Sequence, residues 1–229
     1  MAWNMKDMQD EESFYIVEAP LGEKSKLTLP DGTVVWLNAG SQLRYSSHFN
    51  KNNRDVTLEG EGYFEVTRQQ EKEFVVYSAG CGVHVKGTVF NVKAYPEDPT
   101  MEVRLYEGSV CLSTPSVREE DGIYMEPGEK VHYNKMNKTT RKEKLLYQDD
   151  LSWKDGYYTF DNEQFSIVLD KLSNYYGKII TYDPEVGALR CSGSLNLGDD
   201  MVKVLTGLES TMPVNFTIES EYISVNVKP

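Results

Sequence analysis

Apolar and polar residues alternate on both sides of a tight turn in the stretch "LTLPDGTVVWLNAGSQLRY", residues 27–45. Pro30-Asp31-Gly32 forms the turn, because proline presets φ and glycine supplies the positive φ that a hairpin needs. The alternation predicts a β-hairpin whose second strand points Trp36 into a core, and "NAGS" (38–41) is predicted to be a second turn.

Short strands separated by glycine and proline turns continue over residues 18–133. Their spacing of about 8–12 residues, without helical periodicity, predicts an all-β domain built as a double sheet or as wound β-strands. The candidate strands are 56–58, 63–66, 74–77, 83–85, 90–94, 102–105, 110–112 and 130–133.

The character of the chain changes over residues 134–152, which include "NKMNKTTRKEKLLYQDD". This stretch is polar and carries a cluster of lysine and arginine residues, so we predict a solvated linker, with an anion site as the alternative. Residues 1–17, ahead of the first predicted strand, are assigned to an N-terminal extension.

A period of 3.6 residues then replaces the period of two. It predicts one helix over 163–176, capped by Asp161 or Asn162 and ended by Gly177, and a second helix behind Asp199 that runs to about Thr211. Strands are predicted around the helices at 156–160, 178–182, 190–195, 214–218 and 222–227.

The two helical stretches resemble each other. "FSIVLDKLSNYYGKIITYD" (165–183) aligns with "MVKVLTGLESTMPVNFTIE" (201–219) at an offset of 36 residues, with helix, break and strand in register. Residues 153–229 are therefore predicted to form a small α+β domain of duplicated β-α-β units, with a mixed sheet, helices packed on it and free outer edges.

The apolar positions of these patterns define the predicted cores. In the β-domain they are Trp36, Leu58, Phe64, Val66, Val85, Phe90, Val92, Leu105 and Val110. In the α+β domain they are Phe165, Leu169, Leu172, Val204, Leu205 and Leu208.

Charge and composition exclude several classes of function. The chain of 229 residues has a net charge of −12 and a pI near 4.8, so its surface should repel nucleic acid and anionic lipid. It contains no apolar run of about 20 residues and no secretory signal, and is predicted to be soluble as given. Three cysteines without CxxC spacing predict neither disulfides nor a metal site, and no cofactor is expected.

The sequence lacks the common catalytic motifs, so we predict that the protein is not an enzyme. Its three histidines, His48, His84 and His132, are scattered and are predicted to be structural. Period two places Glu61, Tyr63 and Glu65 on one face, which suits either the paired carboxylates of a glycosidase or the solvated face of a strand. A carbohydrate-binding or glycan-processing β-domain is therefore kept as an alternative, motivated also by the many tyrosines.

Several motifs in this order resemble the periplasmic domain of FecR-type anti-sigma factors of the Bacteroidetes form. They are "LTLPDGTVVWLNAGSQLRY", "VTLEGEGYFEV" (56–66), "VKGTVFNVKAY" (85–95), "LYEGSVCL" (105–112) and "EPGEKVHY" (126–133). "WKDGYYTFDNEQFSIVLDKLSNYYGKII" (153–180) extends the resemblance into a domain similar to the short N-terminal module of secretins and TonB-dependent transporters.

This resemblance implies signalling. Proteins of the family sit in the inner membrane, hold an extracytoplasmic-function sigma factor through a cytoplasmic region, and receive a periplasmic signal from a TonB-dependent outer-membrane transporter. The present chain lacks a cytoplasmic region and a membrane span, so it resembles the periplasmic ectodomain after a missing span. It is expected to reach a sigma factor only through that missing region.

The resemblance also singles out the bond between Gly87 and Thr88. Some FecR-like proteins cleave themselves at a Gly-Thr pair, because a threonine hydroxyl can attack the preceding carbonyl when the backbone is strained. A glycine turn followed by a β-branched strand residue is the explanation that we favour, so we expect an intact chain.

The α+β domain is expected to receive the signal by pairing a sheet edge with the transporter's signalling module. The candidate edges are 178–182 and 222–227, in which Tyr182 and Tyr222 could anchor the contact and a proline at Ser224 would test it. A third interpretation is a scaffold whose duplicated module only oligomerises. The sequence does not name the transporter, its ligand or the sigma factor.

Overall fold

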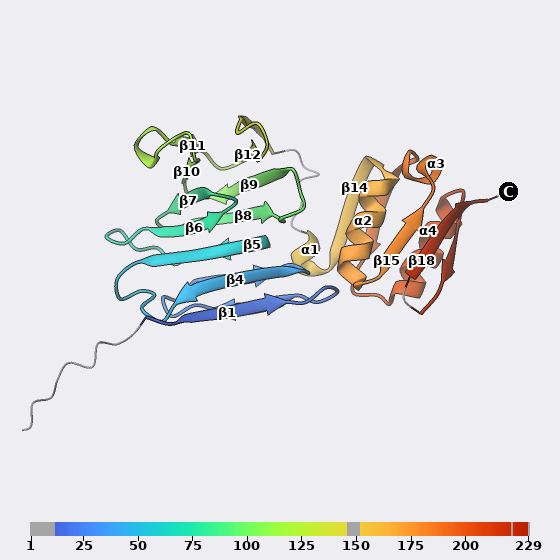
Figure 1. Cartoon of the computed structure of the whole chain (residues 1–229), viewed down its shortest axis with the longest axis horizontal. Coiled ribbons are helices and arrows are strands. Elements are labelled where there is room, and N and C mark those ends of the chain that lie inside the picture. Colours follow the sequence, from blue (N-terminus) through green and yellow to red (C-terminus); the bar gives the residue numbers. More distant parts are fainter. Residues whose placement is uncertain (1–11, 146–151, 221, 229) are drawn as a thin grey trace, which may run out of the picture.

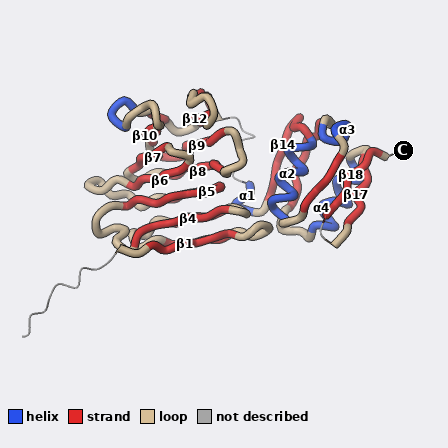
Figure 2. Tube along the Cα trace, in the orientation of Figure 1, coloured by secondary structure: helices blue, strands red, loops and turns tan. Residues whose placement is uncertain are grey.

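The computed structural model describes residues 12–145, 152–220 and 222–228. The protein is mostly β, with a large curled sheet and few helices near its C-terminus, which confirms the predicted fold class. Figure 1 shows the β-domain at one end of an elongated molecule and the α+β domain at the other, and Figure 2 shows how strands dominate the first.

The β-domain consists of thirteen strands in one sheet. They are β1 (Phe14–Ala19), β2 (Ser25–Thr28), β3 (Val34–Leu37), β4 (Ser41–Ser46), β5 (Arg54–Glu65), β6 (Phe74–Ser78), β7 (Cys81–Val85), β8 (Val89–Ala94), β9 (Thr100–Glu107), β10 (Val110–Ser113), β11 (Ile123–Met125), β12 (Glu129–Asn134) and β13 (Thr140–Lys144). A short 3-10 helix, η1 (Glu119–Asp121), lies between β10 and β11.

Strand β5 joins the two halves of this sheet. Its first half pairs with β4 and with β6, and its second half pairs with β3 and with β8. Gly60 lies where the pairing changes, at φ +98°, and a Cβ there would lie 2.7 Å from Cα of Ser41, so only glycine fits. The two strands predicted at 56–58 and 63–66 are thus one strand, and the sheet folds onto itself as a double layer.

The side chains between the two layers form one hydrophobic core. Eight of the nine core residues predicted for this domain are buried: Leu58, Phe64, Val66, Val85, Phe90, Val92, Leu105 and Val110. Trp36 is the exception, because β3 turns Val35 and Leu37 inward at 0% exposure and leaves Trp36 half-buried on the other face. The prediction that Trp36 lies in the core was wrong by one residue of register.

Two edge strands correct the predicted boundaries of the β-domain. Residues 14–17 belong to β1, which pairs with β4, so they are not part of an N-terminal extension; residues 1–11 lie outside the described part. Residues 140–144 form β13, which pairs with β12, so the linker prediction was wrong there; residues 146–151 are not described. Both strands are held by backbone ladders at the sheet edge, which need few apolar contacts.

The second domain contains α1 (Ser152–Asp155), β14 (Tyr157–Gln164), α2 (Phe165–Tyr176), β15 (Ile179–Tyr182), α3 (Pro184–Gly187), β16 (Arg190–Asn196), α4 (Met201–Thr211), β17 (Val214–Ile218) and β18 (Tyr222–Val227). Gly177 ends α2 in the left-handed conformation, as predicted. The predicted caps Asp161 and Asn162 were wrong, because β14 continues to Gln164; Asp161 instead accepts a hydrogen bond from Ser192. Asp200 caps α4 by accepting from the amide of Lys203.

The order strand, helix, strand occurs twice, as β14-α2-β15 and β16-α4-β17. The predicted single mixed sheet is divided into two: an antiparallel pair β14-β16, and a three-stranded mixed sheet in the order β15-β18-β17. The helices pack on these strands around a separate hydrophobic core that contains all six predicted residues, Phe165, Leu169, Leu172, Val204, Leu205 and Leu208. Among the described residues, no helix is long and apolar enough to cross a bilayer.

Candidate functional site

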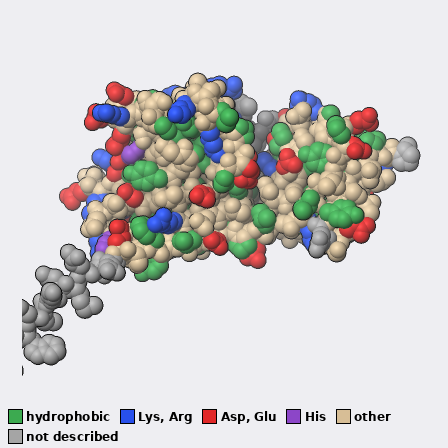
Figure 3. All heavy atoms as spheres, in the orientation of Figure 1, with side chains coloured by type: hydrophobic (Ala, Val, Ile, Leu, Met, Phe, Trp, Pro, Cys, Tyr) green, Lys and Arg blue, Asp and Glu red, His purple; other side chains and the backbone are tan. Residues whose placement is uncertain are grey.

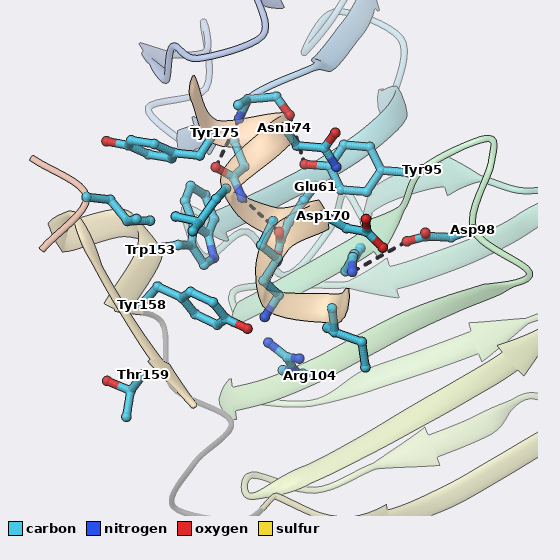
Figure 4. Close-up of a pocket in the computed structure, with 17 residues that line it drawn as sticks. Glu61, Tyr95, Asp98, Arg104, Trp153, Tyr158, Thr159, Asp170, Asn174 and Tyr175 are labelled. Atoms are coloured by element: carbon cyan, nitrogen blue, oxygen red, sulfur yellow. Dashed lines mark hydrogen bonds and ion pairs between the residues drawn. The ribbon is translucent and has the colours of Figure 1, made fainter. Parts of the chain in front are cut away.

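A cavity of about 310 Å³ lies between the two domains. Figure 4 shows its lining: Glu61, Tyr95, Asp98 and Arg104 come from the β-domain, and Trp153, Tyr158, Asp170, Asn174 and Tyr175 come from α1, β14 and α2. Side chains of both domains therefore meet at one place, and a movement of either domain must change its shape.

Glu61 on β5 forms the polar floor of the cavity. It is 7% exposed, and its two carboxylate oxygens accept hydrogen bonds from Nδ2 of Asn38 at 2.9 Å and from Nδ2 of Asn91 at 3.0 Å. Glu65, four residues further along the same strand, instead pairs with Lys154 at 3.7 Å. The two carboxylates have separate partners: Glu61 is bound within the β-domain, and Glu65 contacts the second domain. They are therefore not arranged as the paired acids of a glycosidase.

Lys171 on α2 extends over the opposite wall, with Nζ 4.1 Å from the ring centroid of Tyr158. The side chain of Lys171 is exposed, but protein atoms surround its ammonium, and this desolvation lowers the pKa of Lys171. The negative charge of Glu163 raises that pKa, and the positive charge of Lys93 lowers it further. Burial first, and then the hydrogen bond that Tyr158 donates to Glu163, raise the pKa of Tyr158. The ammonium of Lys171 thus places a positive charge on this wall of the cavity, where protein replaces part of its surrounding water.

Lys154 on α1 fastens the second domain to the first. Its Nζ lies 4.7 Å from the ring centroid of Trp36, 4.5 Å from that of Tyr63 and 3.7 Å from Oε1 of Glu65. Lysine ammonium groups at these distances are attracted by the faces of aromatic rings. The half-buried Trp36 is therefore part of the domain contact.

The loop after β1 makes a second contact between the domains. The amide of Gly22 donates to the carbonyl of Asn174 at 3.1 Å, and Lys24 donates to the carbonyl of Trp153 at 2.6 Å. Gly22 has φ +80°, and a Cβ there would lie 3.0 Å from the carbonyl oxygen of Tyr175, so glycine permits the close approach. Backbone groups of both domains are thus joined directly.

Little in the sequence pattern pointed to this site. Lys154 and Lys171 look like ordinary surface lysines, and the partners of Lys154 lie on strands β3 and β5, far from it in the sequence. A weak signal was available in the half-polar face of β5, which carries Glu61 and Tyr63. Both residues are buried, and Lys154 of the second domain contacts Tyr63, so this face is not solvated.

Gly87 and Thr88 lie where the chain enters β8. A Cβ on Gly87 would lie 2.6 Å from Cβ of Arg68, so the packing requires glycine. Thr88 is 3% exposed, and its hydroxyl donates to the carbonyl of Ser109 at 2.9 Å. Packing and this hydrogen bond explain both residue types, and an intact bond between Gly87 and Thr88 remains our prediction.

The three residues predicted to contact a partner lie on the three-stranded sheet. Tyr182 is on β15 at the sheet edge, where its hydroxyl bonds Asp170. Tyr222 and Ser224 are on β18, which lies between β15 and β17, and Ser224 pairs with Thr181 on one side and Thr217 on the other. The prediction that 222–227 is a free edge was wrong, because distant β15 adds parallel to it.

The two tryptophans in the described residues do not form an open platform for sugars. Trp36 is flanked by Lys26 and Lys154, Trp153 is 9% exposed, and Trp3 lies outside the described residues. Figure 3 shows acidic and basic side chains interspersed on the face in view, without a basic stripe along that face. The face in this view therefore lacks the basic stripe that typically binds nucleic acid.

Comparisons with known proteins match both domains. The family described as "FecR protein" matches residues 16–111, and the family described as "FecR, C-terminal" matches residues 157–225. Two crystal structures of a candidate anti-sigma factor from Parabacteroides distasonis are each 31% identical to this chain with a TM-score of 0.79. They cover 95% and 94% of this chain and 100% of their own. None of the curated proteins matches. The chain therefore belongs to the FecR family of anti-sigma factors.

Proposed function

We propose that this chain is the periplasmic sensor and relay portion of an inner-membrane anti-sigma factor. In this function it receives a signal from a TonB-dependent outer-membrane transporter and thereby controls an extracytoplasmic-function sigma factor. Membership of the FecR family supports a role in signalling. The TonB-dependent transporter, the extracytoplasmic-function sigma factor and the periplasmic location go beyond family membership and are our proposal.

The observation that carries the proposal is the free edge of β15. Within the described sheet this strand pairs only with β18, and Ile179 at its start is 65% exposed. An exposed edge can accept a strand from a partner, because unpaired backbone groups supply affinity and the side chains supply selectivity. We assign this edge to the transporter's signalling module, with Tyr182 bordering the contact.

The interdomain cavity supplies a route for the signal. Strand β15 follows α2 directly, and α2 carries Asp170, Lys171 and Asn174 into the cavity. A partner that pulls or tilts β15 would act on α2, and hence on the contacts that hold the β-domain. Nothing in this route needs catalysis, which agrees with a protein that relays force or shape.

Binding calorimetry with the signalling module of a transporter encoded nearby tests the proposal. Ile179→Lys places a charge on the docking edge and should weaken binding at least tenfold, while the exposed side chain lets the fold persist. Val202→Lys is the matched control, because Val202 is 55% exposed on α4, outside the sheet. Equal affinity of the two variants would remove β15 as the docking edge, and no binding by the unaltered chain would contradict the proposed function.

A further inference from the structure

Three side chains with metal-ligand chemistry converge on the β-domain, apart from the interdomain cavity. His84 lies on β7, Glu73 precedes β6, and Glu119 is in η1. Nδ1 of His84 lies 3.1 Å from Oε2 of Glu73 and 3.5 Å from Oε2 of Glu119, and the three ligand atoms all lie within 4.8 Å of one another. One imidazole nitrogen thus faces two carboxylates.

The other imidazole nitrogen of His84 contacts the hydroxyl of Ser113. Nε2 lies 2.9 Å from Oγ of Ser113, and that hydroxyl donates its own proton to the carbonyl of Gly82. In that arrangement the hydroxyl accepts from Nε2–H, and Nδ1 is directed at the two carboxylates, where it can ligate a cation. His84 is only 8% exposed, so a cation between the three groups would lie in a largely buried site and would offset the repulsion between the two carboxylates.

The packing around His84 holds this orientation. A Cβ on Gly82 would lie 2.7 Å from both Nε2 of His84 and Oγ of Ser113, so glycine makes room for their hydrogen bond. A metal-ligating histidine is usually oriented by a hydrogen bond to its second ring nitrogen, and Ser113 offers such a partner here. Asp55 and His84 both pair with Val75, on opposite sides of β6, so Asp55 adds a further negative charge in the same row.

The distances suit a tetrahedral cation. Zinc bonds of about 2.0–2.2 Å to nitrogen and oxygen place neighbouring ligands roughly 3.3–3.5 Å apart in a tetrahedron. The separations of 3.1 and 3.5 Å around Nδ1 bracket that spacing. We propose that the β-domain binds one Zn²⁺ through Nδ1 of His84 and one carboxylate oxygen each of Glu73 and Glu119, with water in the fourth position.

A bound ion would tie separate parts of the fold together. Glu73 and His84 belong to the hairpin of β6 and β7, whereas Glu119 belongs to the segment between β10 and β11. The side chain of Glu119 is 55% exposed, so few other contacts restrain it. An ion bound to it would fasten the segment between β10 and β11 to the sheet. Metal binding would then stabilise the folded chain by mass action.

The metal-free chain, titrated with zinc chloride in a calorimeter and melted with and without zinc, provides the test. We expect one Zn²⁺ per chain and a higher Tm with zinc. Glu119→Gln and Glu73→Gln, which keep side-chain size, should weaken binding by at least tenfold and abolish the rise in Tm. Ser113→Ala, which removes only the support of the histidine, should weaken it by about tenfold.

His132→Ala is the matched control. His132 also has two glutamate partners, but Nδ1 faces Glu102 at 3.3 Å while Nε2 faces Glu143 at 2.8 Å, so no single ion position joins them. Zinc affinity should be unchanged in this variant. The proposal is overturned if the unaltered chain shows neither heat nor a rise in Tm, or if Glu119→Gln, whose exposed position spares the fold, binds zinc as tightly as His132→Ala does.

Discussion

The ammonium of Lys154 lies 4.7 Å from the ring centroid of Trp36, and the two residues belong to different domains. Lys26, from the same domain as Trp36, lies 4.6 Å from the same ring. The indole thus lies between a lysine of its own domain and one of the other domain. An aromatic residue that the sequence places in a core is here part of a domain contact.

Lys154→Ala should loosen the contact between the domains. It removes two cation–π contacts, each worth about 0.5–2 kcal/mol, and the ion pair with Glu65. The hydrogen bonds of Gly22 and Lys24 remain, so we expect wider domain motion and not separation. Small-angle X-ray scattering should report a larger radius of gyration.

Lys26→Ala serves as the control for this experiment, because it removes a lysine from the ring of Trp36 without changing a residue of the second domain. Its radius of gyration should equal that of the unaltered chain. If both variants expand equally, or neither does, Lys154 does not hold the interface.

Asp31 and Arg54 form a buried ion pair at 3.0 Å, with both side chains at 0% exposure. Arg54 also donates to the carbonyls of Thr67 and Lys72. Asp31→Ala leaves the guanidinium buried without its counter-charge, so the free energy of unfolding should fall by about 3–5 kcal/mol. Urea unfolding monitored by circular dichroism measures the change.

Asp98→Ala is the comparison for that prediction. Asp98 pairs with Lys93 at 3.4 Å, but both side chains are about one-third exposed, so solvent already screens the pair. Its loss should cost less than about 1 kcal/mol. Equal effects of the two substitutions would show that burial of the Asp31 pair does not matter.

Hydrophobic periodicity predicted the cores well, because burial of alternate residues depends mainly on local pattern. Phe64 and Phe165 were both placed correctly from their neighbours, and both are at 0% exposure. In β3 the run of four apolar residues, Val34 to Leu37, allowed either register, and the choice of Trp36 was wrong. Strand β13 carries no apolar residues, so pattern could not reveal it.

Long-range arrangement could not be obtained from the sequence. Strand β18 alternates polar and apolar residues as an edge strand would, yet β15 pairs with it from 43 residues away, Ile179 opposite Tyr222. The same applies to the interdomain cavity and to the group around His84, whose members come from separate strands and turns. Such sites depend on topology, which local patterns do not specify.

Purified protein should retain an intact bond between Gly87 and Thr88. The buried hydroxyl of Thr88 donates to the carbonyl of Ser109, and a carbonyl cannot remove the proton as a general base would. Mass spectrometry after several days should show one mass for the unaltered chain and for Thr88→Ala. Two fragments from the unaltered chain and from Thr88→Ser, but not from Thr88→Ala, would instead establish self-cleavage.

Ser224→Pro should unfold the second domain, because Ser224 lies on a central strand. It pairs with Thr181 on β15 and with Thr217 on β17, so proline would remove a ladder hydrogen bond inside the sheet and introduce a clash. The β-domain has its own core and should remain folded. Nuclear magnetic resonance spectra should therefore lose dispersed signals from the second domain while those of the β-domain persist.

Ser224→Thr is the matched variant for this strand, since threonine keeps the amide and favours strands. We expect its spectrum to match that of the unaltered chain. A folded Ser224→Pro variant would mean that the amide of residue 224 is not needed in the ladder and that β18 is less enclosed than the pairing indicates. Because proline at this position disturbs folding, the docking edge has to be tested on β15, where a charge at Ile179 leaves every ladder hydrogen bond in place.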